Sequence, residues 1–142
     1  MRWIRDSSHW GGAIELSVLA RALNVQIGAM DIITQRLDVY GSDLADPSDR
    51  VYLLYDGIHY DAAALAPQEG APEDFDTTRF ACAADAAESG VRALAASARA
   101  ARQYTDTANF TLRCLVCQKG IVGESAARAH AKETGHTNFG EY

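Results

Sequence analysis

A histidine and an aspartate, His59 and Asp61, stand two positions apart after an apolar run, residues 51–55. The run favours a β-strand. If the strand continues through residue 61, both side chains point to the same face, because successive side chains alternate. A carboxylate beside an imidazole fixes the tautomer of the ring and stabilises its charged form, as the acid does in a nucleophile–His–acid triad. The spacing therefore predicts a general base, His59, and an orienting acid, Asp61.

The alternative is a hydrogen-bonded and inert histidine at the end of a strand. Tyr60 between the pair, and Gly57 before it, which permits close approach of the chain, favour the catalytic interpretation. The nucleophile is less evident. Cys82 precedes an expected helix, whose N-terminus would lower the pKa of a thiol. A buried or incidental cysteine is nevertheless the favoured interpretation of Cys82.

Two cysteines and two histidines further along are spaced for a metal ion. Cys114, Cys117, His130 and His136 form a C-x2-C-x12-H-x5-H pattern. Two thiolates on a tight knuckle and two imidazoles on one helix can surround Zn²⁺ tetrahedrally. A chance Cys-x-x-Cys beside unrelated histidines would not explain the apolar residues that flank the ligands at the places of two short strands. These apolar residues are Phe110, Leu112, Ile121 and Val122. The sequence therefore predicts a structural zinc ion in a ββα finger.

The charge balance argues against a nucleic-acid partner. The 142-residue chain has a formal net charge of −6, whereas binding to phosphates needs a basic surface. From Thr111 onward, basic and acidic residues nearly balance, and the expected finger helix is rich in alanine, which cannot hydrogen-bond to base edges. A structural or protein-binding role is expected for the finger.

Composition also bears on location. No apolar run reaches the 18 or so residues that a membrane-spanning helix needs, and the first residues lack the apolar core of a signal peptide. The chain has three cysteines, and the Cys-x-x-Cys pair suits a metal site in a reducing compartment better than a disulfide framework. We expect a cytoplasmic or nuclear protein.

The elements that would position the candidate residues follow from periodicity. Residues 13–23 favour a helix with Ile14, Val18 and either Leu19 or Ala22 on one face, ended by Asn24. Strands are expected at residues 25–33, 36–40 and 51–55, with a loop over residues 41–50 and a turn at Asp56-Gly57 before a short continuation to residue 61.

The second half of the chain differs from the first in amino-acid composition. Residues 62–79 are rich in proline and acids and favour an exposed linker, whereas residues 85–104 favour an alanine-rich helix with Val91 and Leu94 on one stripe. The finger helix is expected to begin with Ser125 as its cap and to end at Thr134. The expected fold class is α+β, a mixed sheet packed with helices and followed by a small ββα zinc finger.

Several segments in order resemble the second half of an ovarian tumour (OTU) domain deubiquitinase, of the subgroup of ubiquitin thioesterases with a C-terminal zinc finger. The resemblance covers nearly the whole chain and is weakest over residues 62–97. The segments that carry it are Trp10-Gly11-Gly12-Ala13-Ile14-Glu15, the strand from Val51, Gly57-Ile58-His59-Tyr60-Asp61, Arg102-Gln103-Tyr104-Thr105-Asp106, Phe110-Thr111-Leu112-Arg113-Cys114 and residues 130–141.

The resemblance implies a cysteine peptidase that hydrolyses isopeptide bonds to ubiquitin. His59 would match the general base, Asp61 the residue that orients it, and Trp10-Gly11-Gly12 a segment near the substrate channel. The implied partners are ubiquitin or polyubiquitin and, through a preceding domain, the valosin-containing-protein ATPase of endoplasmic-reticulum-associated degradation.

The same resemblance suggests how the chain is divided. Residues 1–66 would be the C-terminal part of the catalytic domain, residues 67–109 a linker with an alanine-rich helix, and residues 110–142 the zinc finger. Apolar surface is expected to be uncovered near Leu16, Leu19 and Leu23.

The chain departs from the family at the nucleophile. In the family this cysteine lies in an Asp-x-x-Cys segment upstream of the Trp-Gly-Gly motif, and no cysteine precedes Trp10. Cys82 follows His59, which reverses the family's order. We therefore expect a fragment or truncated gene product that is marginally stable and has no peptidase activity by itself. The alternative is a non-catalytic module, built from the finger and the OTU remnant, that binds ubiquitin or another protein.

Overall fold

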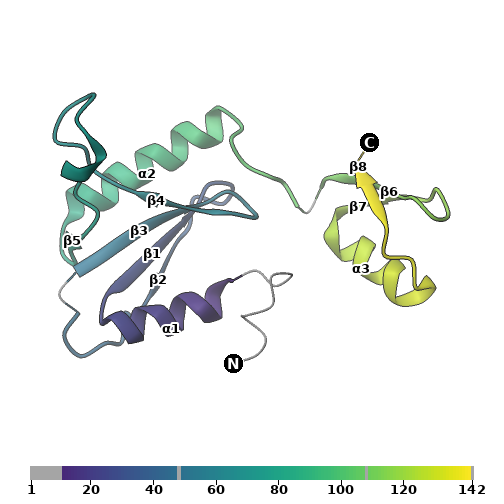
Figure 1. Cartoon of the computed structure of the whole chain (residues 1–142), viewed down its shortest axis with the longest axis horizontal. Coiled ribbons are helices and arrows are strands. Elements are labelled where there is room, and N and C mark those ends of the chain that lie inside the picture. Colours follow the sequence, from purple (N-terminus) through teal and green to yellow (C-terminus); the bar gives the residue numbers. More distant parts are fainter. Residues whose placement is uncertain (1–10, 48, 108, 142) are drawn as a thin grey trace.

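The computed structural model describes residues 11–47, 49–107 and 109–141. Two bodies follow each other along the chain (Figure 1). We call the described residues 11–100 the sheet unit, residues 110–141 the finger, and the described residues between them the linker. A mixed sheet with a helix on each face, followed by a smaller sheet with one helix, confirms the expected α+β class.

The sheet unit is a mixed sheet. Its strands lie in the order β2-β1-β3-β4, with β5 paired to the start of β3. β1 and β3 run parallel, whereas the other pairs are antiparallel. The elements are α1 (Ala13–Leu23), β1 (Gln26–Asp31), β2 (Leu37–Tyr40), β3 (Asp49–Tyr55), β4 (Tyr60–Ala63), η2 (Glu73–Phe75), β5 (Phe80–Ala81) and α2 (Asp85–Ala100).

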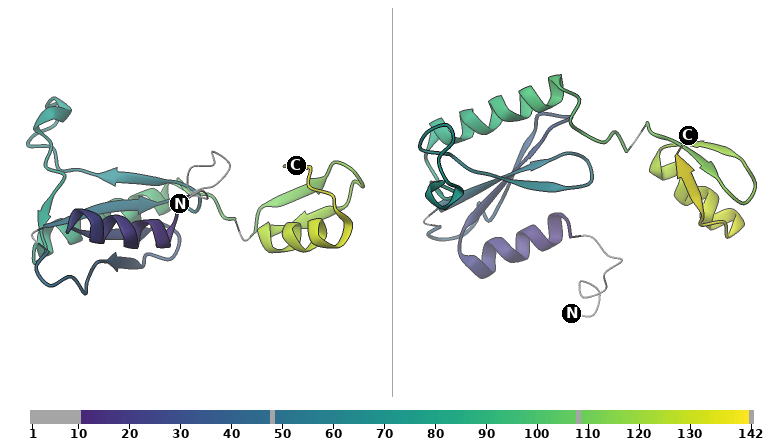
Figure 2. Two further views of the ribbon diagram at one scale, coloured as in Figure 1. Left: turned by 60° about the horizontal axis from the view of Figure 1, so that its bottom comes forward. Right: turned by 45° about the horizontal axis from the view of Figure 1, so that its top comes forward.

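α1 and α2 cover opposite faces of this sheet (Figures 1 and 2). α1 ends at Asn24, as expected, because this residue adopts the left-handed conformation that closes a helix. Ile14 and Val18, which the periodicity places on one face, are 75% and 60% exposed. Leu16 and Ala20 pack on the sheet instead. α1 is apolar on both sides, and the small Ala20 permits close contact with the strands.

α2 belongs structurally to the sheet unit, whereas the sequence placed it with the linker. Its Val91 and Ala95 are buried in one cluster with Met30 and Tyr52 of the sheet. The nearby Glu88 lies 3.5 Å from a guanidinium nitrogen of Arg50 on β3. The small alanine side chains of this helix allow it to lie close to the sheet.

α2 also ends at Ala100, four residues before the expected end. Arg102 adopts a left-handed conformation with φ of 56°. The N–H groups of Arg102 and Gln103 then donate to the carbonyls of Arg99 and Ala98. This is a Schellman closure, which satisfies the last carbonyls of a helix and turns the chain away from its axis. The linker therefore leaves α2 toward the β3–β4 hairpin.

The finger confirms the expected ββα order and adds a third strand. It contains β6 (Thr111–Cys114), β7 (Gly120–Val122), α3 (Gly123–Thr134) and β8 (Phe139–Glu141), with β6 in the middle of the sheet. The cap expected at Ser125 is wrong, because α3 begins at Gly123, directly after β7. The carbonyls of Thr107 and Phe110, rather than a cap side chain, accept its first N–H groups.

Residues 62–79 are mostly exposed, as expected of a connecting segment, although a bridge between Leu65 and Thr77 and the short η2 shape them. In the described part of the chain, no helix combines the length and the apolarity that crossing a membrane requires.

Candidate functional site

The β3–β4 hairpin carries the predicted histidine and aspartate. Tyr55 pairs with Tyr60 across the end of the hairpin, so His59 lies in the turn and β4 starts one residue after it. Nδ1 of His59 lies 3.3 Å from Oδ1 of Asp61, and both side chains are more than half exposed, at 57% and 68%. The structure therefore brings the pair together at a surface that a substrate can reach.

The turn that holds His59 is closed by Asp56. Its carboxylate oxygen Oδ1 accepts the N–H groups of Ile58 at 2.9 Å and His59 at 2.7 Å. Its own N–H donates to the carbonyl of His59 at 3.1 Å. Sequence reasoning marked Asp56-Gly57 as a turn but missed that Asp56 fixes the backbone of the candidate base. The signal was present, because an aspartate in a turn commonly bonds the amides that follow it.

The Gly11-Gly12 segment lies at the same end of the sheet as the hairpin turn. α1 packs on β1 and precedes it directly in the chain, so the two elements run in opposite directions. The start of α1 therefore lies near Asp31 at the end of β1, and Asp31 pairs with Tyr55 at the end of β3. Figures 1 and 2 show the start of α1 and the hairpin turn on the same side. The N–H of Gly12 donates to Glu15 Oε2 at 2.7 Å, so Glu15 caps the helix. Trp10 lies outside the described residues.

A polar hollow of about 190 Å³ lies on the α1 side of the sheet beneath this hairpin. Three tyrosines line it: Tyr40, Tyr55 and Tyr60. The Tyr55 and Tyr60 rings stack with centroids 4.5 Å apart. Burial raises the pKa of all three hydroxyls, and neighbouring carboxylates add to the effect. At neutral pH these hydroxyls therefore stay protonated and can donate hydrogen bonds.

Cys82 is remote from the histidine. It follows β5, which pairs with Asp49 and Arg50 at the start of β3, whereas His59 lies beyond the other end of that strand. Six residue steps along a strand span about 20 Å. The Cys82 thiol lies 3.5 Å from the carbonyl of Pro47. This placement agrees with the interpretation of Cys82 as an incidental thiol.

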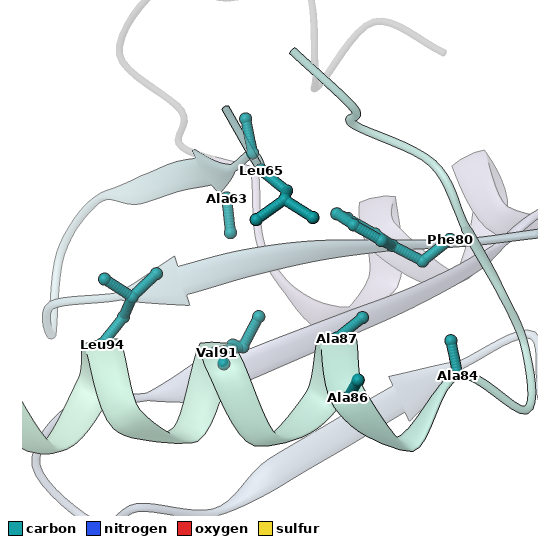
Figure 3. Close-up of a pocket in the computed structure, with 10 residues that line it drawn as sticks. Ala63, Leu65, Phe80, Ala84, Ala86, Ala87, Val91 and Leu94 are labelled. Carbon is teal, nitrogen blue, oxygen red and sulfur yellow. The ribbon is translucent and has the colours of Figure 1, made fainter. Parts of the chain in front are cut away.

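An apolar groove of about 470 Å³ lies between α2 and the segment that leads from β4 to β5. Figure 3 shows Leu65, Phe80, Val91 and Leu94 around it. Every described residue that lines this groove is apolar. The groove can accommodate hydrocarbon, and the residues that line it supply no acid, base or nucleophile.

The finger gathers its four predicted ligands at one point. Cys114 Sγ lies 3.7 Å from His136 Nδ1, and Cys117 Sγ lies 3.6 Å from His130 Nε2. All four ligand atoms lie within 4.8 Å of one another. Tetrahedral Zn²⁺, with bonds of about 2.3 Å to sulfur and about 2.0 Å to nitrogen, would place these atoms about 3.5 Å apart. The donor set therefore fits zinc in both type and spacing.

Local structure orients these ligands and stabilises the thiolate form of one of them. Gly135 closes α3 in the left-handed conformation, which lets His136 turn back toward the cysteines, as expected. Cys114 and His130 are buried, with exposed fractions of 0% and 5%. Burial raises the pKa of the Cys114 thiol, but the backbone N–H groups of Cys117 and Val116 outweigh it and leave a net lowered pKa. Stabilisation of the thiolate favours metal binding.

Comparisons with known proteins agree with both halves of this description. Residues 108–142 match the family model described as the C-terminal C2H2-type zinc finger of ubiquitin thioesterase OTU1. Among solved structures, an ovarian tumour (OTU) domain in complex with ubiquitin shares the fold with a TM-score of 0.61 and 24% identity, over 73% of this chain and 56% of that one.

Full-length relatives extend the match to the whole chain. An ovarian tumour domain-containing deubiquitinating enzyme 2 of Arabidopsis thaliana is 50% identical over 99% of this chain, which spans 69% of that relative. Ubiquitin thioesterase OTU1 of Dictyostelium discoideum is 46% identical and that of Homo sapiens 48%, and the chain spans 43% and 39% of their lengths. The sheet unit has the OTU fold, the finger matches the OTU1 model, and half of the residues are identical to those of the Arabidopsis enzyme. The chain therefore belongs to the OTU1 type of the ovarian tumour domain deubiquitinase family.

Proposed function

We propose that this chain carries the histidine-and-acid part of the active site of a cysteine-type ubiquitin thioesterase, which hydrolyses isopeptide bonds to ubiquitin. The observation that carries the proposal is the 3.3 Å contact between Nδ1 of His59 and Oδ1 of Asp61 on an exposed hairpin. Membership of the OTU1 type and the place of Gly11-Gly12 at the same end of the sheet support it.

The roles follow from the geometry. Asp61 accepts the Nδ1 proton of His59, which leaves Nε2 free to take the proton of an attacking thiol. The thiolate would attack the isopeptide carbonyl, and the imidazolium would protonate the departing lysine amine. A water molecule, activated by the same ring, would then release ubiquitin from the thioester. We propose that the nucleophilic cysteine lies in a part of the longer relatives that this chain does not match.

A chimera tests this proposal. The whole 142-residue chain would replace the matching part of the Arabidopsis relative, and kcat/KM would be measured with a fluorogenic ubiquitin substrate. We expect turnover. We expect His59→Ala and Asp61→Asn each to lower kcat/KM on the order of 10³-fold or more, because the first removes the base and the second replaces the acid with an amide that favours the wrong tautomer of the ring.

Asp74→Asn is the matched control for Asp61→Asn, since Asp74 is an exposed acid on η2, far from the hairpin in sequence. It should leave kcat/KM unchanged. An active chimera whose turnover survives His59→Ala would refute the assignment of the base.

We also propose that the finger holds one structural Zn²⁺, supported by the spacing of its four ligands. Metal analysis of the purified chain should give one zinc per molecule, and Cys117→Ser should lose it. Cys82→Ser serves as the control, because Cys82 lies outside the cluster. Equal zinc content in all three proteins would contradict the assignment.

A binding role without catalysis is the second candidate. Leu115, Val116 and Val122 of the finger are exposed at 49%, 58% and 58%, which offers apolar contacts to a protein partner. Titration of the labelled chain with ubiquitin, followed by amide chemical shifts, separates the two roles. Shifts around the hairpin and the start of α1 favour the enzyme, whereas shifts confined to the finger favour the binding module.

The cellular context is proposed from the family resemblance and from the reduced cysteines of the metal site. We propose a cytoplasmic location, with access to the nucleus, and a role in ubiquitin-dependent degradation. The partner ATPase of the valosin-containing-protein type would be contacted by a domain other than those described. The chain alone should then fail to co-sediment with that ATPase. Stable co-sedimentation would contradict the proposal that another domain makes the contact.

A further inference from the structure

The linker touches the turn that carries His59. The N–H of Thr105 donates to the carbonyl of Asp56 at 2.7 Å. Beside it, Gly57 adopts φ of 110°, and a Cβ built there would lie 2.2 Å from the carbonyl oxygen of Thr105. The two backbones are therefore in direct contact, and only glycine permits both the conformation and the approach.

The linker is bonded to the finger in the same way. The N–H of Thr107 donates to the carbonyl of Thr105 at 3.0 Å, and the carbonyl of Thr107 accepts the N–H of Glu124 at 3.1 Å. The carbonyl of Phe110 accepts the N–H of Gly123 at 2.9 Å. Both finger amides belong to the first turn of α3, whose N–H groups have no partner within the helix. A continuous series of backbone hydrogen bonds thus joins α3 to the His59 turn.

Tyr55 interacts with both the hairpin turn and the start of α3. The hydroxyl of Tyr55 donates to the carbonyl of Gly57, so Tyr55 holds the same turn from within the sheet. Burial chiefly raises the pKa of this hydroxyl, and the carboxylates of Asp31, Asp56 and Glu124 raise it further. Glu124 acts on Tyr55 only because the first turn of α3 lies near the hairpin.

We propose that Thr105 is a positioning residue for His59: the segment from Thr105 to Thr107 forms a strut that holds the Asp56-Gly57 turn and makes the order of this turn depend on α3. The inference rests on the proposed function for the importance of His59, although the contacts themselves do not. It assigns to the linker a role in shaping the hairpin as well as in joining two bodies.

A dependence on the metal follows. Small zinc fingers fold only when the metal is bound, so removal of zinc releases their helix. Without α3, the carbonyls of Thr107 and Phe110 lose the N–H groups of Glu124 and Gly123, and the linker gains freedom. The Asp56 side-chain bonds then hold the turn without external support, so they open more often and expose the amides of Ile58 and His59.

The first experiment compares two glycine substitutions in the zinc-loaded chain. Gly57→Ala inserts a Cβ against Thr105, whereas Gly70→Ala, also at positive φ (76°), meets nothing within 4 Å and controls for backbone strain. We expect Gly57→Ala to speed amide exchange of Thr105 and His59 at least tenfold. Its His59 ring signals should move toward those of Asp61→Asn, because the tautomer is no longer held. Gly70→Ala should match the wild type.

The result that overturns the proposal is a Gly57→Ala chain in which Thr105 exchanges faster while the His59 ring signals stay at their wild-type positions. The same holds if Thr105 and His59 respond equally to the two substitutions. Thr105→Pro, which removes the donor N–H without touching the turn, should reproduce the effect of Gly57→Ala.

The second experiment needs no substitution and stands if Gly57→Ala fails to fold. A chelator is added to the wild-type chain, and amide exchange is followed at each residue. We expect Ile58, His59 and Thr105 to exchange at least tenfold faster together with α3, while Ile27 and Tyr52 of the sheet core keep their protection. Loss of protection in the finger alone would contradict the proposal that the order of the Asp56-Gly57 turn depends on α3. These measurements do not depend on catalytic turnover. An inactive chimera would therefore contradict the proposed function without contradicting this inference.

Discussion

His59 is held mainly through its backbone. The carboxylate of Asp56 binds its N–H group, and Thr105 supports the carbonyl of Asp56 from outside the hairpin. Asp61 is the only described side chain within ion-pairing distance of the ring. A catalytic base on a turn needs this kind of support, because a displacement of about 1 Å can cost on the order of 10²-fold in rate.

Arg102 makes the first prediction at the scale of a residue. It occupies a left-handed position that costs an L-residue about 1–2 kcal/mol, and glycine is the usual residue there. We expect Arg102→Gly to raise the free energy of unfolding by about 0.5–1 kcal/mol in urea denaturation, since relief of strain exceeds the added chain entropy. Arg99→Gly, inside α2 and equally exposed, should lower it by about 1 kcal/mol. Destabilisation by both substitutions would contradict this account.

The three tyrosines beneath the hairpin predict a pH dependence. Their pKa values are raised in the folded chain, by burial first and by neighbouring carboxylates. Unfolded tyrosine titrates near pH 10, so above that pH the unfolded chain releases protons that the folded chain retains. The contribution of these tyrosines to the free energy of unfolding should therefore be constant below about pH 9 and fall as the pH rises through 10 and beyond. Urea denaturation at several pH values measures this, and the Tyr40→Phe, Tyr60→Phe double variant should show a smaller fall.

At the scale of elements, composition did not decide how either helix packs. α1 has apolar residues on two sides, and the sheet accepts the side with the smaller residue, Ala20. α2 is rich in alanine, yet Ala95 is fully buried in one cluster with Val91 and residues of the sheet. Small side chains allow close packing between a helix and a sheet, and a hydrophobic pattern does not distinguish this from exposure.

Ala95 and Ala96 provide a matched test of this packing. Ala95 is 0% exposed, whereas its neighbour Ala96 faces solvent. Ala95→Leu should lower the free energy of unfolding by about 1–3 kcal/mol, because the larger side chain overfills the contact. Ala96→Leu should change it by less than about 0.5 kcal/mol. Equal effects in thermal or urea denaturation would mean that α2 does not pack on the sheet as described.

At the scale of the whole molecule, the sheet unit exposes one side of α1. Ile14, Val18, Leu19 and Leu23 are 48–75% exposed, which extends the patch expected near Leu19 and Leu23. Leu16, expected in that patch, is instead buried on the sheet. The longer OTU1 relatives contain residues that could cover this face, since the chain spans only 43% and 39% of two of them.

The catalytic prediction for the 142-residue chain follows from its cysteines. Cys114 and Cys117 belong to the metal cluster, and Cys82 lies at the far end of β3 from His59. We expect no hydrolysis of a fluorogenic ubiquitin substrate above background, with wild type and Cys82→Ala indistinguishable. Turnover that is lost in Cys82→Ala would show that this thiol reaches the histidine after all.

The sequence determined the features whose partners are close along the chain or bound by strict spacing. The positions of β1 to β4 along the chain, the hairpin that joins His59 to Asp61 and the four metal ligands all follow from short-range alternation, turn residues and ligand chemistry. The buried side of α1, the docking of α2 and the contact of Thr105 with Asp56 were decided by tertiary structure alone. These depend on which surfaces meet in space, and a backbone hydrogen bond between distant segments leaves no pattern of side chains to mark it.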